Sequence, residues 1–382
     1  MSGFTILSYP TEKNSTLLSL TTERSRYMLP LGGRFRIVDF TVRNSVSSGA
    51  KETIIFTNTQ DHLEEYVNFY HEDYSEAGHP VRVYPFSQED PSSVLEAISS
   101  SDASYFVLYN GDNPSVIDLS SILKKFKGTK KKGVLIKLKI AGKATMSQRV
   151  VISDKKTLVS VVKKALTEKY KSPNFFEMII NMLMHSGIGT STVDALYWNI
   201  NSVTDYYNLN RDIIWNEEIS SLIYKDRIIK SQIKKEGFAM LDEYGIIKNS
   251  FVSDYCYING KVENSIIFPG SEIHQGAVVR DSIILPFAKI GPNAKVINAI
   301  IDEGNDIDER FIVGAGCRIG SEEKFIKNRD FPNILNNSIT LIGRENFLPE
   351  GVFVGSACFI AHGKAQEYFL TKNRLEDGES VL

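Results

Sequence analysis

The chain has 382 residues, of which 42% are hydrophobic and 24% are charged, and its formal net charge is −2. This length favours two to three domains, and the composition is ordinary for a globular protein rather than a disordered one. The small net charge excludes a strongly basic nucleic-acid-binding protein, and no stretch approaches the ~20 apolar residues that cross a membrane. We therefore expect neither a nucleic acid nor a membrane as a partner.

The cysteines and the first residues bear on the compartment. Cys256, Cys317 and Cys358 are far apart and odd in number, which fits a reducing compartment better than a disulfide framework. The chain begins without a charged segment ahead of a long apolar run, so we do not expect a signal peptide. A cytoplasmic protein is the resulting prediction.

Up to about residue 200, short apolar segments alternate with helical patterns, which predicts an α/β domain with a mostly parallel sheet. Strands are predicted at 4–9, 53–57, 81–86, 105–109 and 134–140, and helices at 37–46, 61–70, 93–99 and 119–126. In such sheets the ligand lies outside the carboxyl ends of the strands. Residues 10–34, 57–62 and 110–114 are therefore expected to surround a shared crevice.

The following segment is less regular. Residues 150–153 and 158–162 look like a hairpin, and residues 175–184 look like a helix. Tyr197 and Trp198 end a strand, and residues 203–210 begin another helix. The polar and mixed stretch 215–245 is expected to cross to the next domain.

The last third of the chain is a repeat. The segments Asn264-Ser-Ile-Ile-Phe-Pro, Asp281-Ser-Ile-Ile-Leu-Pro and Asn298-Ala-Ile-Ile-Asp-Glu start 17 residues apart (264, 281, 298). Aliphatic residues recur every six positions: Ile267, Ile273, Val279; Ile284, Ile290, Val296; Ile301, Ile307, Val313, Ile319; and Ile342, Leu348, Val354, Ile360. A period of six is typical of the hexapeptide β-helix, in which three hexads make one triangular coil. An all-β sandwich is the alternative. Residues 321–338 break the repeat and are predicted to be a loop extruded between coils.

Two segments near the N-terminus resemble a known family. Leu20-Thr-Thr-Glu-Arg-Ser-Arg26 precedes Gly32-Gly-Arg34-Phe-Arg36-Ile-Val-Asp-Phe40. This resembles the ADP-glucose pyrophosphorylases, or glucose-1-phosphate adenylyltransferases, which have L-T-x-x-R-A-K-P followed by G-G-K-[FY]-R-[IL]-[IV]-D-F. The resemblance implies a Rossmann-like nucleotidyltransferase domain, which we place at 1–230. A linker at 231–244 and a left-handed parallel β-helix at 245–382 would follow.

The resemblance also implies an activity and a site. The family makes ADP-glucose for glycogen synthesis from ATP and glucose 1-phosphate, with Mg²⁺ held by two aspartates. Asp112, in Gly111-Asp112, matches the first aspartate, and Arg26 matches a catalytic lysine. Gln60 and Lys164 match substrate-binding positions. Arg34 and Arg36 match a segment that contributes to an anionic-effector site.

Several positions depart from the family pattern. Residues 11–17 contain no glycine where catalytic subunits have G-G-x-G-T-R-L, and a phosphate cradle needs the close backbone approach that glycine allows. Ile200 stands where the second aspartate is expected, and isoleucine cannot bind a cation. Arg26-Tyr27 replaces Lys-Pro, and arginine is longer and planar. These changes remove most of the electrostatic stabilisation that phosphoryl transfer relies on.

The degraded loop and the retained G-G-[KR]-[FY]-R segment resemble a regulatory second subunit found in some bacteria. We therefore expect a weakly catalytic or non-catalytic subunit that forms a hetero-tetramer with a catalytic subunit of its family, or a homo-oligomer, and binds an anionic effector. One alternative is an active nucleotidyltransferase with a divergent loop. Another is a hexapeptide acyltransferase using His274 or His362. A third is a scaffold relative such as the exchange-factor subunits of translation initiation, which lack the second motif.

Overall fold

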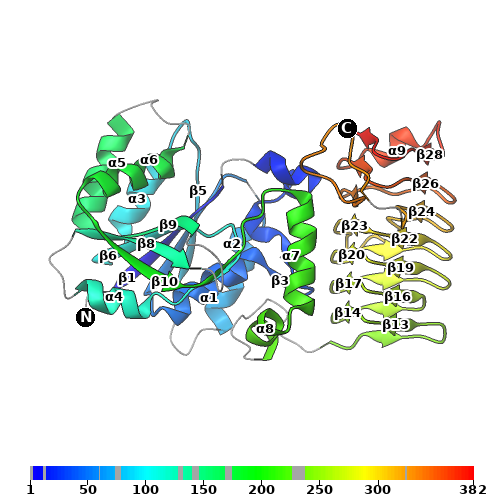
Figure 1. Cartoon of the computed structure of the whole chain (residues 1–382), viewed down its shortest axis with the longest axis horizontal. Coiled ribbons are helices and arrows are strands. Elements are labelled where there is room, and N and C mark those ends of the chain that lie inside the picture. The colour runs from blue at the N-terminus through cyan, green and yellow to red at the C-terminus, as the bar shows by residue number, and fades with distance from the viewer. Residues whose placement is uncertain are drawn as a thin grey trace. The chain divides into compact units, whose positions relative to one another are not determined.

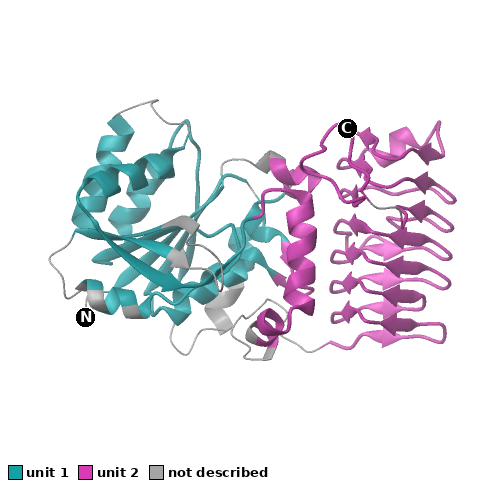
Figure 2. Cartoon of the chain, in the orientation of Figure 1, with its two compact units in different colours: residues 1–13, 24–29, 36–199 teal, residues 14–23, 30–35, 200–382 magenta. Residues whose placement is uncertain are grey.

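The computed structural model describes residues 3–11, 14–59, 61–73, 79–127, 132–139, 146–167, 174–225, 237–322 and 325–382. The chain forms two compact units (Figure 2). Unit 1 comprises Met1–Lys13, Arg24–Leu29 and Arg36–Asn199, and unit 2 comprises Asn14–Glu23, Pro30–Phe35 and Ile200–Leu382. The main boundary between the units falls after residue 199, and the first 35 residues contribute to both.

Unit 1 is built on a seven-stranded sheet of order β10-β8-β9-β6-β1-β4-β5 (Figure 1). Its strands are β1 (Phe4–Tyr9), β4 (Glu52–Thr57), β5 (Val81–Pro85), β6 (Tyr105–Asn110), β8 (Gly133–Lys139), β9 (Met146–Asp154) and β10 (Gly189–Asp194). β9 runs antiparallel to β6 and β8, and the other pairs are parallel. The predicted mostly parallel sheet is confirmed.

Side chains of the central strands alternate between two hydrophobic clusters. Leu7 packs in one cluster with Phe56 and Phe176, while Ile6 packs in the other with Val107 and Ile122. Burial on both faces is characteristic of parallel sheets. The helices of this unit are α1 (Ile37–Ser47), α2 (Leu63–Asp73), α3 (Ser92–Ser100), α4 (Ser120–Lys127), α5 (Lys155–Thr167) and α6 (Phe175–His185). Short elements complete it: η2 (Arg26–Met28), β7 (Ser115–Val116) and β11 (Leu196–Tyr197). β3 (Phe35–Arg36) begins at the last residue of a unit 2 segment.

The predicted hairpin at 150–162 is wrong. Residues 150–153 do lie in a strand, β9, but residues 158–162 lie in α5. Leu158 and Val162 are fully buried in the same cluster, as residues four apart on one helical face are. A short apolar run does not distinguish a strand from one turn of a buried helix.

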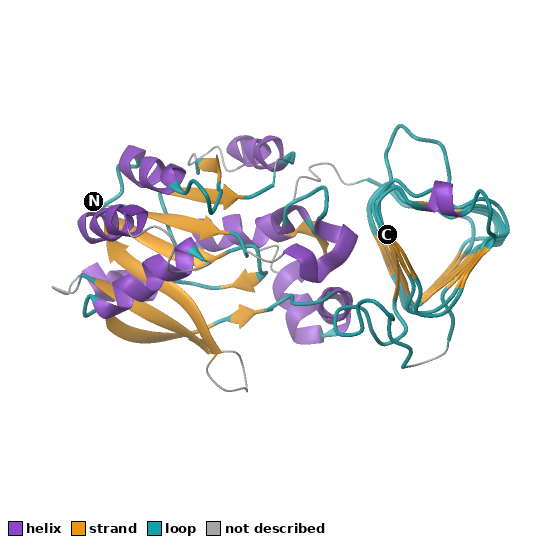
Figure 3. Cartoon of the chain, turned by 90° about the horizontal axis from the view of Figure 1, so that it is seen from above, coloured by secondary structure: helices purple, strands orange, loops and turns teal. Residues whose placement is uncertain are grey.

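Unit 2 contains a triangular coil of parallel strands, seen end-on in Figure 3. Three sheets form its sides: β12-β15-β18-β21, β13-β16-β19-β22-β24-β26-β28 and β14-β17-β20-β23-β25-β27-β29. Ile284, Ile290 and Val296 are fully buried in one cluster along the axis, and the chain returns in register, with Ile267 paired to Ile284 and Ile284 to Ile301. This is the β-helix that the six-residue period predicts.

The strands of the coil are short. They are β12 (Met240–Leu241), β13 (Ile246–Lys248), β14 (Phe251–Val252), β15 (Tyr257–Ile258), β16 (Lys261–Glu263), β17 (Ile266–Ile267), β18 (Glu272–Ile273), β19 (Val278–Arg280), β20 (Ile283–Ile284), β21 (Lys289–Ile290), β22 (Lys295–Ile297), β23 (Ala299–Ile301), β24 (Arg318–Ile319), β25 (Thr340–Ile342), β26 (Phe353–Val354), β27 (Phe359–Ile360), β28 (Arg374–Leu375) and β29 (Ser380–Val381). The rest of unit 2 includes η1 (Asn14–Thr21), β2 (Pro30–Leu31), α7 (Val203–Trp215), α8 (Glu217–Ser220), η3 (Ser221–Lys225) and α9 (Ala365–Tyr368).

One predicted inward residue points outward. Ile307 is 84% exposed, whereas Val313 is buried and bridges to Ile290 of the preceding coil. Three hexads close one turn, so one of the four in the series 301–319, the one that contains Ile307, is extruded as a loop. The predicted interruption between Ile319 and Ile342 is confirmed, because the described residues of 321–338 form no strand.

The outward side chains of one sheet are also apolar. Ile266, Ile283, Ile300 and Leu341 are buried although they lie outside the axial cluster. α7 packs at this face, with the Tyr207 hydroxyl donating to the Asp281 carbonyl oxygen at 2.5 Å. A Cβ on Gly33 would lie 2.4 Å from the Phe251 ring, so residues 30–35 also approach it closely. These contacts explain why both segments belong to unit 2.

None of the helices in the described part of the chain is long and apolar enough to cross a membrane.

Candidate active site

The carboxyl ends of β1 and β6 bring four polar residues of unit 1 together. Tyr9 and Asn110, the last residues of these strands, are paired, and Thr11, Asp112 and Asn113 follow directly. Arg26, from η2, lies 3.8 Å from Asp112. These residues of unit 1 do meet at the strand ends, and a ligand crevice there stays a prediction.

The carboxylate of Asp112 is enclosed by the protein itself. Its side chain is 1% exposed. The backbone N–H of Thr11 donates to Oδ2, and the Thr11 hydroxyl donates to Oδ1 at 2.6 Å. Nε of Arg26 lies 3.8 Å from Oδ2. Both carboxylate oxygens therefore already have partners within the chain.

A network of amides surrounds the Thr11 hydroxyl. Asn110 and Asn113 donate to Oγ1 of Thr11 at 3.2 and 3.3 Å, while the hydroxyl donates to Asp112. A hydroxyl has one donor and two acceptor lone pairs, so Thr11 uses its whole capacity here. Arg26, 2% exposed, also donates from Nη2 to Oδ1 of Asn113 at 3.0 Å. These residues form one connected hydrogen-bond network.

Buried tyrosines line the network. The pKa of Tyr27 is raised well above its usual value by burial and then by the negative charge of Asp112. The same two causes raise the pKa of Tyr197, and burial raises that of Tyr109 to about 12. These phenols stay neutral at physiological pH. The Tyr27 hydroxyl is 2.7 Å from the Ser8 hydroxyl.

Packing explains the glycine before Asp112. A Cβ on Gly111 would lie 2.0 Å from Oγ of Ser8 and 2.9 Å from Oγ1 of Thr41. Thr41 also donates to the Gly111 carbonyl oxygen at 2.7 Å. Gly111 is thus required by the close approach of β1 and α1, whether or not Asp112 binds a ligand.

The residues around Asp112 do not fit a protein-held Mg²⁺ ion. Mg²⁺ requires near-octahedral oxygen coordination and usually one or two available carboxylates. The single carboxylate here is bound by two donors of Thr11 and by a cation. Among the described residues, no group of three or more His, Cys, Asp or Glu side chains could hold a metal. Ile200, at the expected second-aspartate position, is 1% exposed.

Comparisons with known proteins extend the likeness over the chain. A family model described as "GlmU-like, C-terminal hexapeptide" matches residues 235–328. A glucose-1-phosphate adenylyltransferase of Fervidobacterium nodosum is 23% identical over 394 residues, covering 91% of this chain and 93% of that protein. The enzyme so named in Bacillus thuringiensis (strain Al Hakam) is 22% identical, covering 79% and 92%. The one in Acetivibrio thermocellus is 28% identical over 187 residues, covering 49% and 42%.

Over most of its length, the chain is similar to glucose-1-phosphate adenylyltransferases. The residues matched by the hexapeptide model lie within unit 2.

Two further positions were assigned by the family resemblance. Lys164 lies exposed in the last turn of α5, a helix that contacts α3 and α6. Gln60 lies outside the described residues. The substrate-binding role of both positions stays a prediction.

The two arginines predicted to bind an effector, Arg34 and Arg36, contact their own chain. Arg34, in unit 2, lies 3.8 Å from Asp254. Arg36, in unit 1, donates to the Met28 carbonyl oxygen, and its guanidinium lies 5.7 Å from the Tyr66 ring centroid. An effector would have to compete with these partners, so anion binding here stays a prediction.

The histidines considered for acyl transfer each face a carboxylate on the β-helix. Nε2 of His274 is 2.8 Å from Glu272, and its ring lies edge-on to Phe311. Nε2 of His362 is 3.3 Å from Glu345.

The residue that sequence reasoning missed is Thr11. The available signal was a hydroxyl residue directly after a strand, at the point where the family has its glycine-rich loop.

Proposed function

We propose that this chain is a regulatory, largely non-catalytic subunit of a glucose-1-phosphate adenylyltransferase that serves glycogen synthesis. The proposal rests on the carboxylate of Asp112, which accepts hydrogen bonds from Thr11 and lies beside Arg26. Thr11 donates to both of its oxygens and Arg26 lies 3.8 Å away, so a metal would have to compete with these partners. A phosphoryl-transfer site depends on fixed positive charge and donors aimed at the phosphates, and here these groups bind one another.

The expected catalytic deficit is large. Loss of one fixed donor or charge in such a site costs roughly 10²–10³ in rate. The missing glycines, Ile200 and the enclosed Asp112 affect one catalytic unit, so their effects need not add. A deficit of at least ~10³ relative to a catalytic relative is the reasonable expectation.

The first coil of the β-helix supports assembly with a second subunit. Its apolar side chains are exposed: Phe238 is 90%, Met240 63%, Ile246 54% and Tyr244 52% exposed. β12, β13 and β14 are each the end strand of a sheet, so among the described residues their outer edges are unpaired, and such edges promote association. Large exposed apolar patches mark interaction sites. We assign this end to a catalytic subunit of the same family.

The test uses the purified chain, alone and mixed with a relative that has an intact G-G-x-G-T-R-L loop. ADP-glucose formation is measured with ATP, glucose 1-phosphate and Mg²⁺. Alone, the chain should be at least ~10³-fold slower than the relative. In the mixture, light scattering should show a hetero-oligomer, and the response of the relative to anionic effectors should change.

Two results would overturn the proposal. Turnover by the isolated chain of about 1 s⁻¹ or more lies in the ordinary enzyme range and would establish the active-enzyme alternative. A mixture in which the chain stays separate and leaves the kinetics of the relative unchanged would exclude a regulatory role.

Arg34→Ala, which removes one effector cation, should weaken the effector response without altering assembly.

A further inference from the structure

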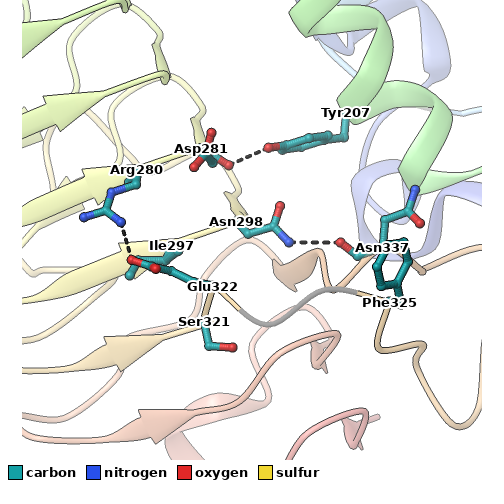
Figure 4. A pocket seen from close by; sticks show the side chains of 9 residues that line it. All are labelled: Tyr207, Arg280, Asp281, Ile297, Asn298, Ser321, Glu322, Phe325 and Asn337. Atoms are coloured by element: carbon teal, nitrogen blue, oxygen red, sulfur yellow. Dashed lines mark hydrogen bonds and ion pairs between the residues drawn. The ribbon is translucent and has the colours of Figure 1, made fainter.

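The interruption of the hexad repeat forms a pocket on unit 2 (Figure 4). The pocket has a volume of about 580 Å³, and its lining includes Tyr207, Asp281, Asn298, Glu322, Phe325 and Asn337. This volume lies within the range of small-molecule sites, roughly 300–1,000 Å³.

Three separate elements supply the walls. Asp281 and Asn298 occupy left-handed corners of successive coils, with φ of 47° and 50°. α7 contributes Tyr207. The inserted segment between β24 and β25 contributes Glu322, Phe325 and Asn337. Insertions in repeat proteins commonly lie on the binding face, and this one closes over a corner of the coil.

The insertion is anchored to the β-helix. Asn328 is 1% exposed and donates to the Ala357 carbonyl oxygen at 2.9 Å. Leu335 is fully buried. Thr204 of α7 donates to Oδ1 of Asn336 at 3.1 Å. The wall therefore has fixed side-chain contacts on both sides, as expected for a preformed site.

The charges that border the pocket are balanced. Arg280 donates to Glu322 and lies 3.6 Å from Glu263. Asp281 is 3.5 Å from Arg211. Recognition of phosphate uses unopposed arginine or lysine groups, but each arginine here faces a carboxylate. An anionic ligand would meet Asp281 and Glu322 as well.

The other polar side chains of the lining include the amides of Asn298 and Asn337, and the lining also contains two aromatic rings. Asn298 donates from Nδ2 to the backbone carbonyl oxygen of Asn337 at 3.0 Å, and its side-chain oxygen Oδ1 can accept. The Asn337 amide can both donate and accept. Phe325 is 84% exposed, which leaves its ring accessible to a ligand.

We infer that this pocket binds a neutral sugar, as a single ring or as the end of a short oligosaccharide. Sugar hydroxyls both donate and accept, so they match amide and carboxylate side chains. The apolar face of a sugar ring can pack on Phe325 or Tyr207. The inference rests on the lining alone and holds whether or not the chain is a regulatory subunit.

The experiment measures binding of maltotriose, glucose and glucose 1-phosphate to the full chain by calorimetry and ligand-observed NMR. Few direct hydrogen bonds and an open site predict a Kd on the order of 1 mM for a neutral sugar. Phe325→Ala should weaken binding by roughly two- to tenfold, the range for loss of one aromatic contact. The matched control is Ile307→Ala, since Ile307 is also 84% exposed but lies outside the pocket lining.

Tighter binding of maltotriose than of glucose would identify a chain end as the ligand, and equal binding would identify a single ring. Absence of saturable binding of either sugar at about 50 mM, far above that Kd, would overturn the inference. So would tighter, Phe325-dependent binding of glucose 1-phosphate, because that would make the pocket an anion site. Equal weakening by Ile307→Ala would show that the effect is not local.

Discussion

Replacing Asp112 by asparagine distinguishes a structural carboxylate from one held ready for a ligand. The substitution keeps the size of the side chain but removes its charge. Arg26, 2% exposed, would lose the carboxylate 3.8 Å from its Nε, and Thr11 would donate to a neutral amide instead. If the carboxylate serves the fold, the variant must be less stable.

The magnitude follows from the enclosure of the pair. A hydrogen bond to a charged group contributes about 1.5–3 kcal/mol, against about 0.5–1.5 kcal/mol for a neutral one. Removing one partner of a buried pair costs about 3–5 kcal/mol. These losses describe one carboxylate and overlap, so we expect about 3 kcal/mol. For a unit of this size that corresponds to a fall in Tm of about 6–12 °C.

The two tryptophans of the chain allow the measurement, because Trp198 lies in unit 1 and Trp215 in unit 2. In a Trp215→Phe background, the fluorescence of Trp198 reports unfolding of unit 1. Asp102→Asn is the matched control, since Asp102 is exposed, and should change stability by less than about 0.5 kcal/mol. If Asp112→Asn were as stable as its parent, or more stable, the carboxylate would not be a structural anchor and our account of the site would be wrong.

Four further outcomes are expected. Ile200→Asp should raise ADP-glucose formation by less than about tenfold, because the first carboxylate stays enclosed, and a gain of ~10² would contradict this. Burial raises the pKa of Cys256 and Cys358 to about 12, so a thiol reagent at pH 8 should modify them only after unfolding; rapid native labelling would refute it. The folded state keeps both thiols protonated up to a higher pH than the unfolded state does. The free energy of unfolding should therefore be unchanged below pH 9 and fall between pH 9 and about 12. Met240→Glu should reduce assembly in light scattering, whereas Leu370→Glu, which alters a side chain 82% exposed elsewhere, should not.

The β-helix could be predicted because its signal is periodic. Ile284, Ile290 and Val296 recur at one phase, and only a coil of three hexads brings such residues to a shared interior. Ile307 carries the same signal and is 84% exposed. Which hexad is extruded depends on how each turn of the coil closes. This closing depends on the whole coil and not on the pattern of one hexad.

In unit 1, elements with long apolar patterns could be predicted from the sequence, whereas elements with short patterns could not. β1 and α1 have long, clear apolar patterns, and both were predicted close to their observed bounds. The segment 158–162 is too short for its period to be assigned. The structure shows that this segment belongs to the helix α5, whose buried side chains pack in one cluster with those of the sheet.

From the family resemblance, the sequence predicted Asp112 and Arg26 as site residues, and it showed that residues 11–17 contain no glycine. It could not show that Thr11 binds the carboxylate, since these residues are 101 positions apart and meet only because β1 and β6 pair in parallel. Nor could it show that residues 30–35 belong to the unit of the β-helix. Motifs and periods are local and can be found in one chain, whereas the partners of a buried charge depend on which distant segments the fold brings together.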